Sequence, residues 1–280
     1  MKTKAVSVRV PATSSNLGPG FDCLGVALKL HNTVRVAHAK EDAAEGMIAE
    51  TARAFFQAAK IRSFPFAASV KGSVPPARGL GSSVTVRLGV AAGLNRLAGE
   101  PLPDSRLLAL VVELEGHPDN AVPAFHGGFA ACAGKRYLLA PVAPRLRFVG
   151  LVPDFELPTK KARAVLPKKV PLSDAVANVG RTALLTAAFA AQEYEALPGL
   201  FDDRLHQPYR AKLLPGWDAV REAALKAGAL GFYLSGAGST LMALTLKDSE
   251  KIAAAMLRAA RKAGIGARTF VTQADNRGLV

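Results

Sequence analysis

Apolar and polar residues alternate along several short segments of the chain. Side chains at every second position of a strand point to the same face, so this alternation is typical of strands with one buried face. The first case is Val6, Val8 and Val10, which ends at Pro11. The predicted strands are residues 5–10, 33–37, 66–70, 128–133, 137–141, 147–151, 231–234, 241–246 and 267–273.

Between these strands, apolar residues recur at spacings of three and four, which places them on one face of a helix. Leu107, Leu110 and Val111 form such a face, and Pro103-Asp104-Ser105 before them is a typical helix start. The predicted helices are residues 47–60, 84–97, 106–115, 174–192, 217–227 and 249–262.

The order of these elements divides the chain near residues 152–158, where Pro153 and Pro158 bracket a short linker. A length of 280 residues suits one large or two modest domains. We therefore predict two domains, residues 1–153 and 154–280. Both mix helices with strands, so the predicted fold class is α+β.

Composition argues against a membrane or secreted protein. Apolar residues make up 50% of the chain, yet no apolar run reaches the roughly 18 residues that cross a bilayer. The beginning of the chain is typical of a strand rather than of the apolar core of a signal peptide. Cys23 and Cys132 form neither a disulfide framework nor a metal-binding spacing. We expect a soluble cytoplasmic protein that does not act on membranes.

The net charge of +14 favours an anionic partner. The basic residues are scattered, however, and one Trp and four Tyr offer few rings for stacking on bases. We therefore expect a phosphorylated small molecule as the partner, and no nucleic acid. For most of these basic residues, we expect no more than a solvated surface that keeps the protein soluble.

The segment from Pro75 to Ser83 combines two glycines and two serines between a predicted strand and a predicted helix. Glycines leave room for an anion, and the first N–H groups of a helix have no internal partner, so the segment predicts a phosphate-binding loop. The same residues would also make an ordinary turn with a serine N-cap. The segment lacks the Gly-Lys-Ser/Thr of a Walker loop and the three spaced glycines of a dinucleotide fingerprint.

Two further glycine-bearing loops lie far from this one in the sequence. Residues 11–22 place Asn16 and Asp22 six positions apart, where a strand passes into a turn. Residues 235–240 lie between two predicted strands and hold small residues that let the backbone approach an anion. A flexible hairpin is the alternative interpretation of this last loop.

A fourth segment, residues 113–120, follows a predicted helix and carries groups suited to a metal ion or a proton. A Mg²⁺ ion near phosphates takes one or two carboxylate oxygens and a hydroxyl, which Ser83 and a glutamate would supply. Glu113 and Glu115 lie two positions apart and face different sides of a helix, so only one of them can join such a site. A solvated glutamate is the alternative, and the isolated His117 argues against zinc.

Together and in order, these segments resemble the GHMP kinases over nearly the whole chain. Residues 78–83 and 234–239 are typical of the whole family, and residues 11–22, 115–120 and 203–215 are similar to the branch that acts on homoserine. The matching segments are Pro-Ala-Thr-Ser-Ser-Asn-Leu-Gly-Pro-Gly-Phe-Asp (11–22), Arg-Gly-Leu-Gly-Ser-Ser (78–83), Glu-Gly-His-Pro-Asp-Asn (115–120), Asp-Arg-Leu-His-Gln-Pro-Tyr-Arg-Ala-Lys-Leu-Leu-Pro (203–215) and Leu-Ser-Gly-Ala-Gly-Ser (234–239).

The resemblance implies a fold and an activity. The fold is an N-terminal domain like ribosomal protein S5 followed by a ferredoxin-like C-terminal sandwich. The activity is phosphorylation of the side-chain hydroxyl of L-homoserine by ATP with Mg²⁺, which gives O-phospho-L-homoserine for threonine biosynthesis. A homodimer is one assembly that the resemblance allows. Another small-molecule kinase of the family and a non-catalytic binding protein with this fold are the alternatives.

The resemblance also implies roles for individual residues. The implied ATP-binding residues are Pro76, Arg78, Gly79, Leu80, Gly81, Ser82, Ser83, Gly236 and Gly238. The implied homoserine-binding residues are Asn16, Asp22, Asn120, Thr159, Arg163 and Arg210, of which Asn16, Asp22 and Asn120 are also the implied catalytic residues. The implied Mg²⁺ contacts are Ser83 and Glu115, with Glu113 in reserve.

The expected mechanism depends on charge and position more than on a strong base. An amide such as Asn120 cannot take a proton from the acceptor, although Asp22 can accept it late. The chain also departs from the family at Val84-Thr85-Val86-Arg87, where small residues are usual, and at Ser239, where proline is common. An expected asparagine is absent near Gly46, so the choice of nucleotide stays open.

Overall fold

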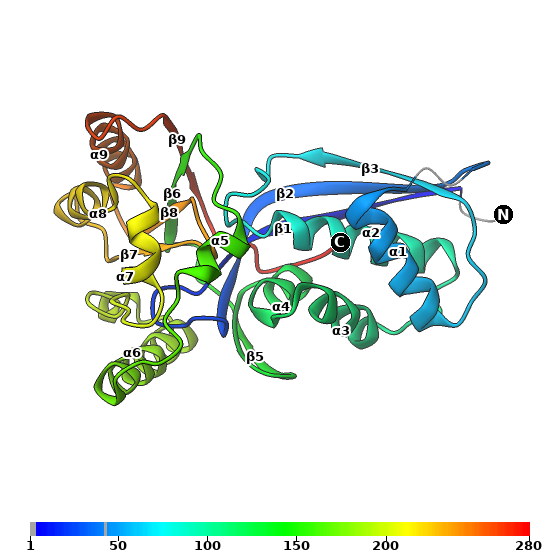
Figure 1. Ribbon diagram of the computed structural model, residues 1–280, viewed down its shortest axis with the longest axis horizontal. Helices are drawn as coiled ribbons and strands as arrows, with labels where there is room; N and C mark the ends of the chain where they lie inside the picture. Colours follow the sequence, from blue (N-terminus) through cyan, green and yellow to red (C-terminus); the bar gives the residue numbers. More distant parts are fainter. Residues whose placement is uncertain (1–3, 42–43) are drawn as a thin grey trace.

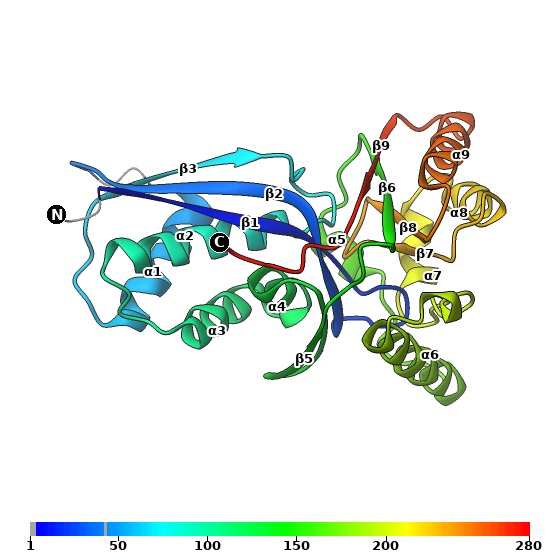
Figure 2. The same ribbon diagram turned by 180° about the vertical axis from the view of Figure 1, so that it is seen from behind.

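The computed structural model describes residues 4–41 and 44–280, and it contains two sheets side by side along the long axis of the molecule (Figures 1 and 2). The first sheet has the order β1-β2-β4-β5, with β3 paired to β2, and all of its pairings are antiparallel. Its strands are β1 (Ala5–Ser15), β2 (Leu24–His38), β3 (Phe66–Gly72), β4 (Phe129–Ala133) and β5 (Arg136–Ala140).

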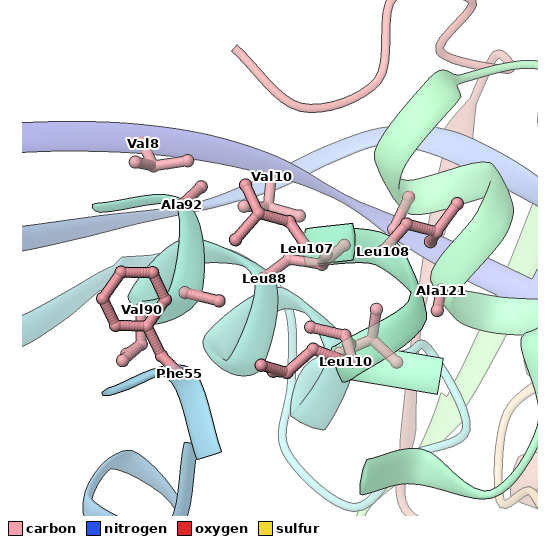
Figure 3. Close-up of a cluster of buried hydrophobic side chains, with 14 of the residues drawn as sticks. Val8, Val10, Phe55, Leu88, Val90, Ala92, Leu107, Leu108, Leu110 and Ala121 are labelled. Atoms are coloured by element: carbon pink, nitrogen blue, oxygen red, sulfur yellow. The ribbon is translucent and has the colours of Figure 1, made fainter. Parts of the chain in front are cut away.

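Helices cover one face of the first sheet (Figure 1). Val8 and Val10 of β1 and Val34 of β2 point into this side and are fully buried. Figure 3 shows valines of β1 packed among leucines of the covering helices in a single apolar cluster. The helices are α1 (Gly46–Ala59), α2 (Ser82–Leu97), α3 (Asp104–Glu115) and α4 (Pro118–His126).

The second sheet is antiparallel with the order β7-β8-β6-β9. In chain order these strands are separated by helices as β-α-β-β-α-β, so the sheet has the ferredoxin-like arrangement that the resemblance implies. The elements are β6 (Arg147–Pro153), α5 (Thr159–Ala164), α6 (Leu172–Ala191), η1 (Tyr194–Ala196), α7 (Gln207–Arg210), η2 (Ala211–Leu213), α8 (Trp217–Lys226), β7 (Gly231–Leu234), β8 (Leu241–Thr245), α9 (Ser249–Lys262) and β9 (Ala267–Thr272).

All of the predicted strands and helices are present, but some extend further than the pattern indicates. β1 runs on to Ser15, so the first half of the predicted 11–22 loop is strand and the turn begins at Asn16. The sequence pattern missed α4, α5 and α7 because each is short and begins next to a proline, which favours a turn in sequence reasoning.

Sheet membership differs in two places from the predicted division into residues 1–153 and 154–280. β6 precedes the predicted boundary, yet it pairs with β8 and β9 of the second sheet. After β9 the chain returns to the first sheet, where Val280 exchanges two backbone hydrogen bonds with Arg9. Residues 1–3 of the predicted first domain lie outside the described residues. As a statement about independent folding units, the boundary stays a prediction.

A core cluster at the junction holds the two sheets together. It combines Leu17 and Leu24 from the first sheet and its following turn with Phe148 and Tyr233 from the second, and all four side chains are at most 1% exposed. The loops that leave these strands therefore meet in a fixed arrangement. Among the described residues, no helix is both long and apolar enough to cross a membrane.

Candidate active site

A cavity of about 670 Å³ lies where the loops from the two sheets meet. The three glycine-bearing loops and the 115–120 segment all contribute to its lining, although they are far apart in the sequence. Many of the predicted site residues line it: Asn16, Asp22, Pro76, Arg78, Gly79, Gly81, Ser82, Ser83, Glu115, Asn120, Thr159, Arg163, Arg210 and Gly236.

The predicted phosphate loop passes into α2 through two glycines in the left-handed region. Gly79 has a φ of 72°, and a Cβ there would lie 2.1 Å from the carbonyl oxygen of Ser235, so only glycine fits. Gly81 takes the N-cap position and no side chain caps the helix, which corrects the alternative of a serine N-cap. The N-terminus of α2, with Ser82 and Ser83 in its first turn, faces the cavity and offers N–H groups to an anion.

Three of the predicted ATP-binding residues have positions that limit their role. The side chain of Leu80 is 1% exposed in the junction core, so only its backbone can face a ligand. Arg78 donates to the carbonyl oxygens of Pro153 (3.1 Å) and Asp154 (2.8 Å), so its guanidinium ties the loop to the linker. Gly238 does not line the cavity.

Hydrogen bonds join the third loop to the other two. The Ser235 hydroxyl donates to the carbonyl oxygen of Gly79 at 2.6 Å, and the Gly236 N–H donates to that of Ser15 at 3.0 Å. The amide of Asn16 donates to the Gly236 carbonyl at 2.8 Å and accepts the Asp22 N–H at 3.0 Å. Asn16 therefore connects two loops and also positions Asp22 in the cavity.

The structure resolves which glutamate faces the site. Glu115 accepts a hydrogen bond from the Ser83 hydroxyl at 2.9 Å, and its other oxygen lies 2.8 Å from Nε of Arg87. Glu113 points away, with a 62% exposed side chain that pairs with Arg106 at 3.4 Å. Glu113, the reserve candidate for Mg²⁺, therefore lies outside the site.

The Ser83 and Glu115 pair fits a magnesium ion. A hydroxyl and one carboxylate are donors that Mg²⁺ takes when nucleotide phosphates and water complete its six positions. In the described part of the chain, no group of three or more His, Cys, Asp or Glu side chains could hold a metal by itself. The site thus suits a metal that arrives with a nucleotide.

The carboxyl of Asp119 is a site residue that the sequence analysis missed. It lines the cavity at the start of α4 and is only 3% exposed. Burial raises the pKa of the Asp119 carboxyl from 3.8 to about 6, with a further increase from the nearby Asp22 carboxylate. Its position depends on Gly25 of β2, where a Cβ would lie 1.8 Å from the Asp119 carbonyl oxygen. An acidic residue just after Pro118, at a helix start, was the available signal.

The neighbouring Asn120 is already bonded within the site. Its side-chain oxygen accepts from the Thr13 hydroxyl at 2.7 Å, and its nitrogen donates to the Ser15 hydroxyl at 2.9 Å. These bonds hold α4 against the end of β1. The same nitrogen also donates to the Asp119 carboxylate at 3.4 Å. The free capacity of Asn120 toward a substrate is therefore one oxygen lone pair.

Two arginines face the cavity from the second half of the chain. Nη2 of Arg163 lies 2.8 and 3.0 Å from the two carboxylate oxygens of Asp22, and α5 carries both this arginine and Thr159. Arg210 is 1% exposed and donates to the carbonyl oxygens of Ala162 and Gly236, each at 3.1 Å. Burial, with the charge of Arg163, lowers the pKa of Arg210 to about 10.

His206 was also missed and supports this side of the cavity. Its Nε2 donates to the Gly18 carbonyl oxygen at 2.8 Å, and its ring stacks on Phe21 at a centroid distance of 5.0 Å. Burial lowers the pKa of His206 to about 4, so the ring is neutral near pH 7 although Asp203 is close. Phe21 in turn lies under Arg210, whose guanidinium carbon is 5.0 Å from the ring centre.

Comparisons with known proteins agree with this geometry. The profile of the GHMP kinases N terminal domain matches residues 46–128, and that of the GHMP kinases C terminal domain matches residues 186–266. The homoserine kinase of Microchaete diplosiphon is 41% identical, covering 98% of this chain and 96% of that protein. One from a Synechococcus strain is 43% identical, covering 95% and 94%.

A solved structure supports the same assignment at the level of fold. The crystal structure of homoserine kinase from Cytophaga hutchinsonii superposes with a TM-score of 0.92, is 27% identical, and the match covers 100% of this chain and 98% of that one. The fold and the site thus define a small-molecule kinase. The chain belongs to the GHMP kinase family and, within it, to the homoserine kinases. The predicted family and fold are confirmed.

Proposed function

We propose that the protein transfers the terminal phosphoryl group of ATP to the side-chain hydroxyl of L-homoserine and releases O-phospho-L-homoserine, an intermediate of threonine biosynthesis. The observation that carries this proposal is the arrangement of charge in the cavity. The lining combines the backbone and hydroxyl groups of the glycine-bearing loops with a mixed set of carboxylates and guanidinium groups.

The mixed set suits a free amino acid. An α-ammonium needs a carboxylate acceptor, which Asp22 supplies, and an α-carboxylate needs cations, which Arg163 and Arg210 supply. A sugar or a mevalonate-like alcohol carries no ammonium and gives no reason to place both signs of charge together. The Thr159 hydroxyl and the side-chain oxygen of Asn120 are the uncharged polar groups that we assign to the same substrate.

ATP would bind with its phosphates at the N-terminus of α2. Gly79, Gly81 and Gly236 bring backbone close to the cavity without side chains in the way, and the hydroxyls of Ser82 and Ser83 add donors. Ser83 and Glu115 would hold Mg²⁺, which neutralises charge on the phosphates when it is bound. We propose that Pro76, Arg78, the Leu80 backbone and Gly238 fix the shape of the two loops that bind ATP, residues 75–83 and 235–240.

The chain itself performs two tasks in the reaction. It aligns the hydroxyl with the transferring phosphoryl group, and it accepts a proton late in a loose transition state. Both carboxylate oxygens of Asp22 lie within hydrogen-bond distance of Arg163. Asp119 has the raised pKa of about 6, so we assign it as the acceptor of the hydroxyl proton, in place of the Asp22 assignment. Asn120 and Asn16 orient the groups around it.

The decisive test is a coupled assay of ADP release with homoserine, serine, mevalonate and galactose, each with ATP and with GTP. We expect turnover with homoserine that requires Mg²⁺ and ATP. Turnover of another alcohol without turnover of homoserine would refute the substrate, and binding without turnover of any alcohol would identify a non-catalytic protein. A cytoplasmic location belongs to the same proposal, because ATP and the free thiols Cys23 and Cys132 suit that compartment.

A further inference from the structure

Arg87 of helix α2 is a buried charge next to the cavity. It is 9% exposed, and an arginine is rarely buried to this extent unless it is paired. Its side chain does not line the cavity, whereas Ser83, Val84 and Val86 of the same helix do. Any role of Arg87 in the reaction therefore passes through a neighbouring side chain rather than through a contact with the substrates.

That neighbour is Glu115, the carboxylate that we assign to Mg²⁺. Nε of Arg87 lies 2.8 Å from Oε1 of Glu115, while Oε2 accepts a hydrogen bond from the Ser83 hydroxyl at 2.9 Å. Ser83 and Arg87 are four positions apart on α2, so they lie on the same face of the helix and meet the same partner. The two carboxylate oxygens of Glu115 are therefore held separately, one by a charge and one by a hydroxyl.

The contact between Arg87 and Glu115 is an ion pair rather than a directed hydrogen bond. Among the described residues, Nε of Arg87 is buried without a hydrogen-bond partner, because its N–H is not aligned with the carboxylate oxygen. The two side chains are 10% and 18% exposed, so solvent and salt screen their attraction little. Arg87 therefore supplies Glu115 with a positive charge at a fixed place.

The outer end of the same guanidinium is bonded to helix α1. Nη2 of Arg87 donates to a carboxylate oxygen of Glu50 at 2.8 Å, and Nη1 donates to the Thr51 hydroxyl at 3.4 Å. α1 packs against both α2 and α3. These bonds fix the direction of the Arg87 side chain, so that its Nε stays beside Glu115. Arg87 thus makes two separable contacts, one with α1 and one with the proposed metal ligand.

We propose that Arg87 is a positioning residue for magnesium, which holds the Glu115 carboxylate in the orientation that keeps one oxygen beside Ser83. This inference rests on the proposed function, because it takes Ser83 and Glu115 as the Mg²⁺ contacts. A glutamate side chain loses much rotational freedom when it is fixed, and one that is already fixed loses less when it binds a metal. Groups that orient a metal ligand typically change metal affinity by about 10- to 100-fold.

The positive charge of Arg87 opposes this effect only weakly. A guanidinium repels a metal cation, but the carboxylates of Glu50 and Glu115 each lie 2.8 Å from this one and offset its charge. A purely structural role is the alternative, in which Arg87 only fastens α1 to α2. Removal of Arg87 would then lower stability without changing how nucleotide binding depends on metal, so the two roles predict different results.

The test is calorimetric titration of the protein with ADP, once with Mg²⁺ and once with a chelator in its place. The ratio of the two affinities, which we call the magnesium gain, is measured without turnover. Arg87→Met keeps an unbranched side chain and removes the charge, and we expect it to lower the magnesium gain about tenfold while the affinity for metal-free ADP stays constant. Circular dichroism checks the fold. If Arg87→Met does not fold, Arg87→Gln keeps an amide donor for Thr51 and should show the same loss.

The matched control is Glu50→Gln, which loosens the same guanidinium from α1 but leaves its contact with Glu115, so the magnesium gain should stay at the wild-type value. Arg87→Lys should also retain it, because an ammonium there supplies the same charge beside Glu115. An undiminished magnesium gain in folded Arg87→Met, or an equal loss in Glu50→Gln or Arg87→Lys, would overturn this inference and leave the proposed function intact. A wild type without any magnesium gain would refute the proposed metal site, and this inference with it.

Discussion

The buried carboxyl of Asp119 makes the effect of the site on the stability of the fold measurable. Burial raises the pKa of this group from 3.8 to about 6, and the residue is only 3% exposed. At about 1.4 kcal/mol per pKa unit, that difference corresponds to about 3 kcal/mol. Asp119→Asn keeps the size of the side chain and removes its charge, so it isolates this effect.

The direction in which stability changes with pH follows from how many protons the folded and unfolded states bind. A carboxyl whose pKa is higher in the folded state binds more protons there, so its favourable contribution is complete below pH 3.8 and is lost as the pH rises through about 6. The folded wild type is therefore penalised at neutral pH by an ionised, desolvated carboxylate. We expect Asp119→Asn to stabilise the protein by about 3 kcal/mol above pH 7, but by only about 0.5 kcal/mol at pH 4.

The measurement is the free energy of unfolding in urea for wild type and variant at pH 4 and pH 8, without nucleotide. At pH 8 the expected gain corresponds to a rise of about 5–10 °C in Tm. The same variant should lose about 100-fold or more in kcat, because the carboxylate that we assign to accept the hydroxyl proton is gone. Asp202→Asn, at an exposed ion pair, is the control and should change stability by less than about 1 kcal/mol. A variant less stable than wild type at pH 8, or a gain equal at both pH values, would refute the reasoning.

Three further predictions concern the same cavity. Ser83→Ala and Glu115→Gln should each lower kcat by about 100- to 1,000-fold with small changes in substrate KM, since charge neutralisation acts in the transition state; an inactive Glu113→Gln with an active Glu115→Gln would show that the metal assignment is wrong. Arg163→Leu should raise the KM for homoserine roughly 10- to 150-fold while the KM for ATP stays constant; equal rises would place Arg163 on the nucleotide. Gly79→Ala should lower stability by about 1–3 kcal/mol and weaken ATP binding in calorimetry, because its Cβ would meet the Ser235 carbonyl; wild-type affinity would contradict the close approach.

A rise in the KM for homoserine alone, as predicted for Arg163→Leu, is not expected for Arg210→Leu. The Arg210 guanidinium donates to two carbonyl oxygens and is buried, so Arg210→Leu would remove one hydrogen-bond donor from each of these carbonyls and a buried side chain from the core. A loss of stability would then accompany any loss of substrate binding. Arg163 has a 38% exposed side chain and is the cleaner test of carboxylate recognition.

Local sequence determined most of the elements of this protein. Alternation of apolar residues depends only on neighbours in the chain, which is why the cores of β1 and β2 could be predicted from Val8, Val10 and Val34. The glycine-bearing loops could also be found, because Gly79 and Gly81 adopt left-handed backbone conformations that favour glycine. The short helices α4, α5 and α7 could not be predicted from the pattern, because proline occurs both at the beginning of helices and just after their end.

Tertiary structure decided which of the polar residues form the site. Glu113 and Glu115 look alike in the sequence, and only the packing of α3 against α2 places Glu115 beside Ser83 and Arg87 while Glu113 stays in solvent. Asp119 became a candidate base only because α4 packs against β2 and removes water from its carboxyl. Desolvation depends on every group that surrounds an atom in space, and those groups come from segments more than a hundred residues apart. A one-dimensional pattern therefore contains the groups that carry the chemistry, whereas their burial, and with it their pKa, is a property of the folded chain alone.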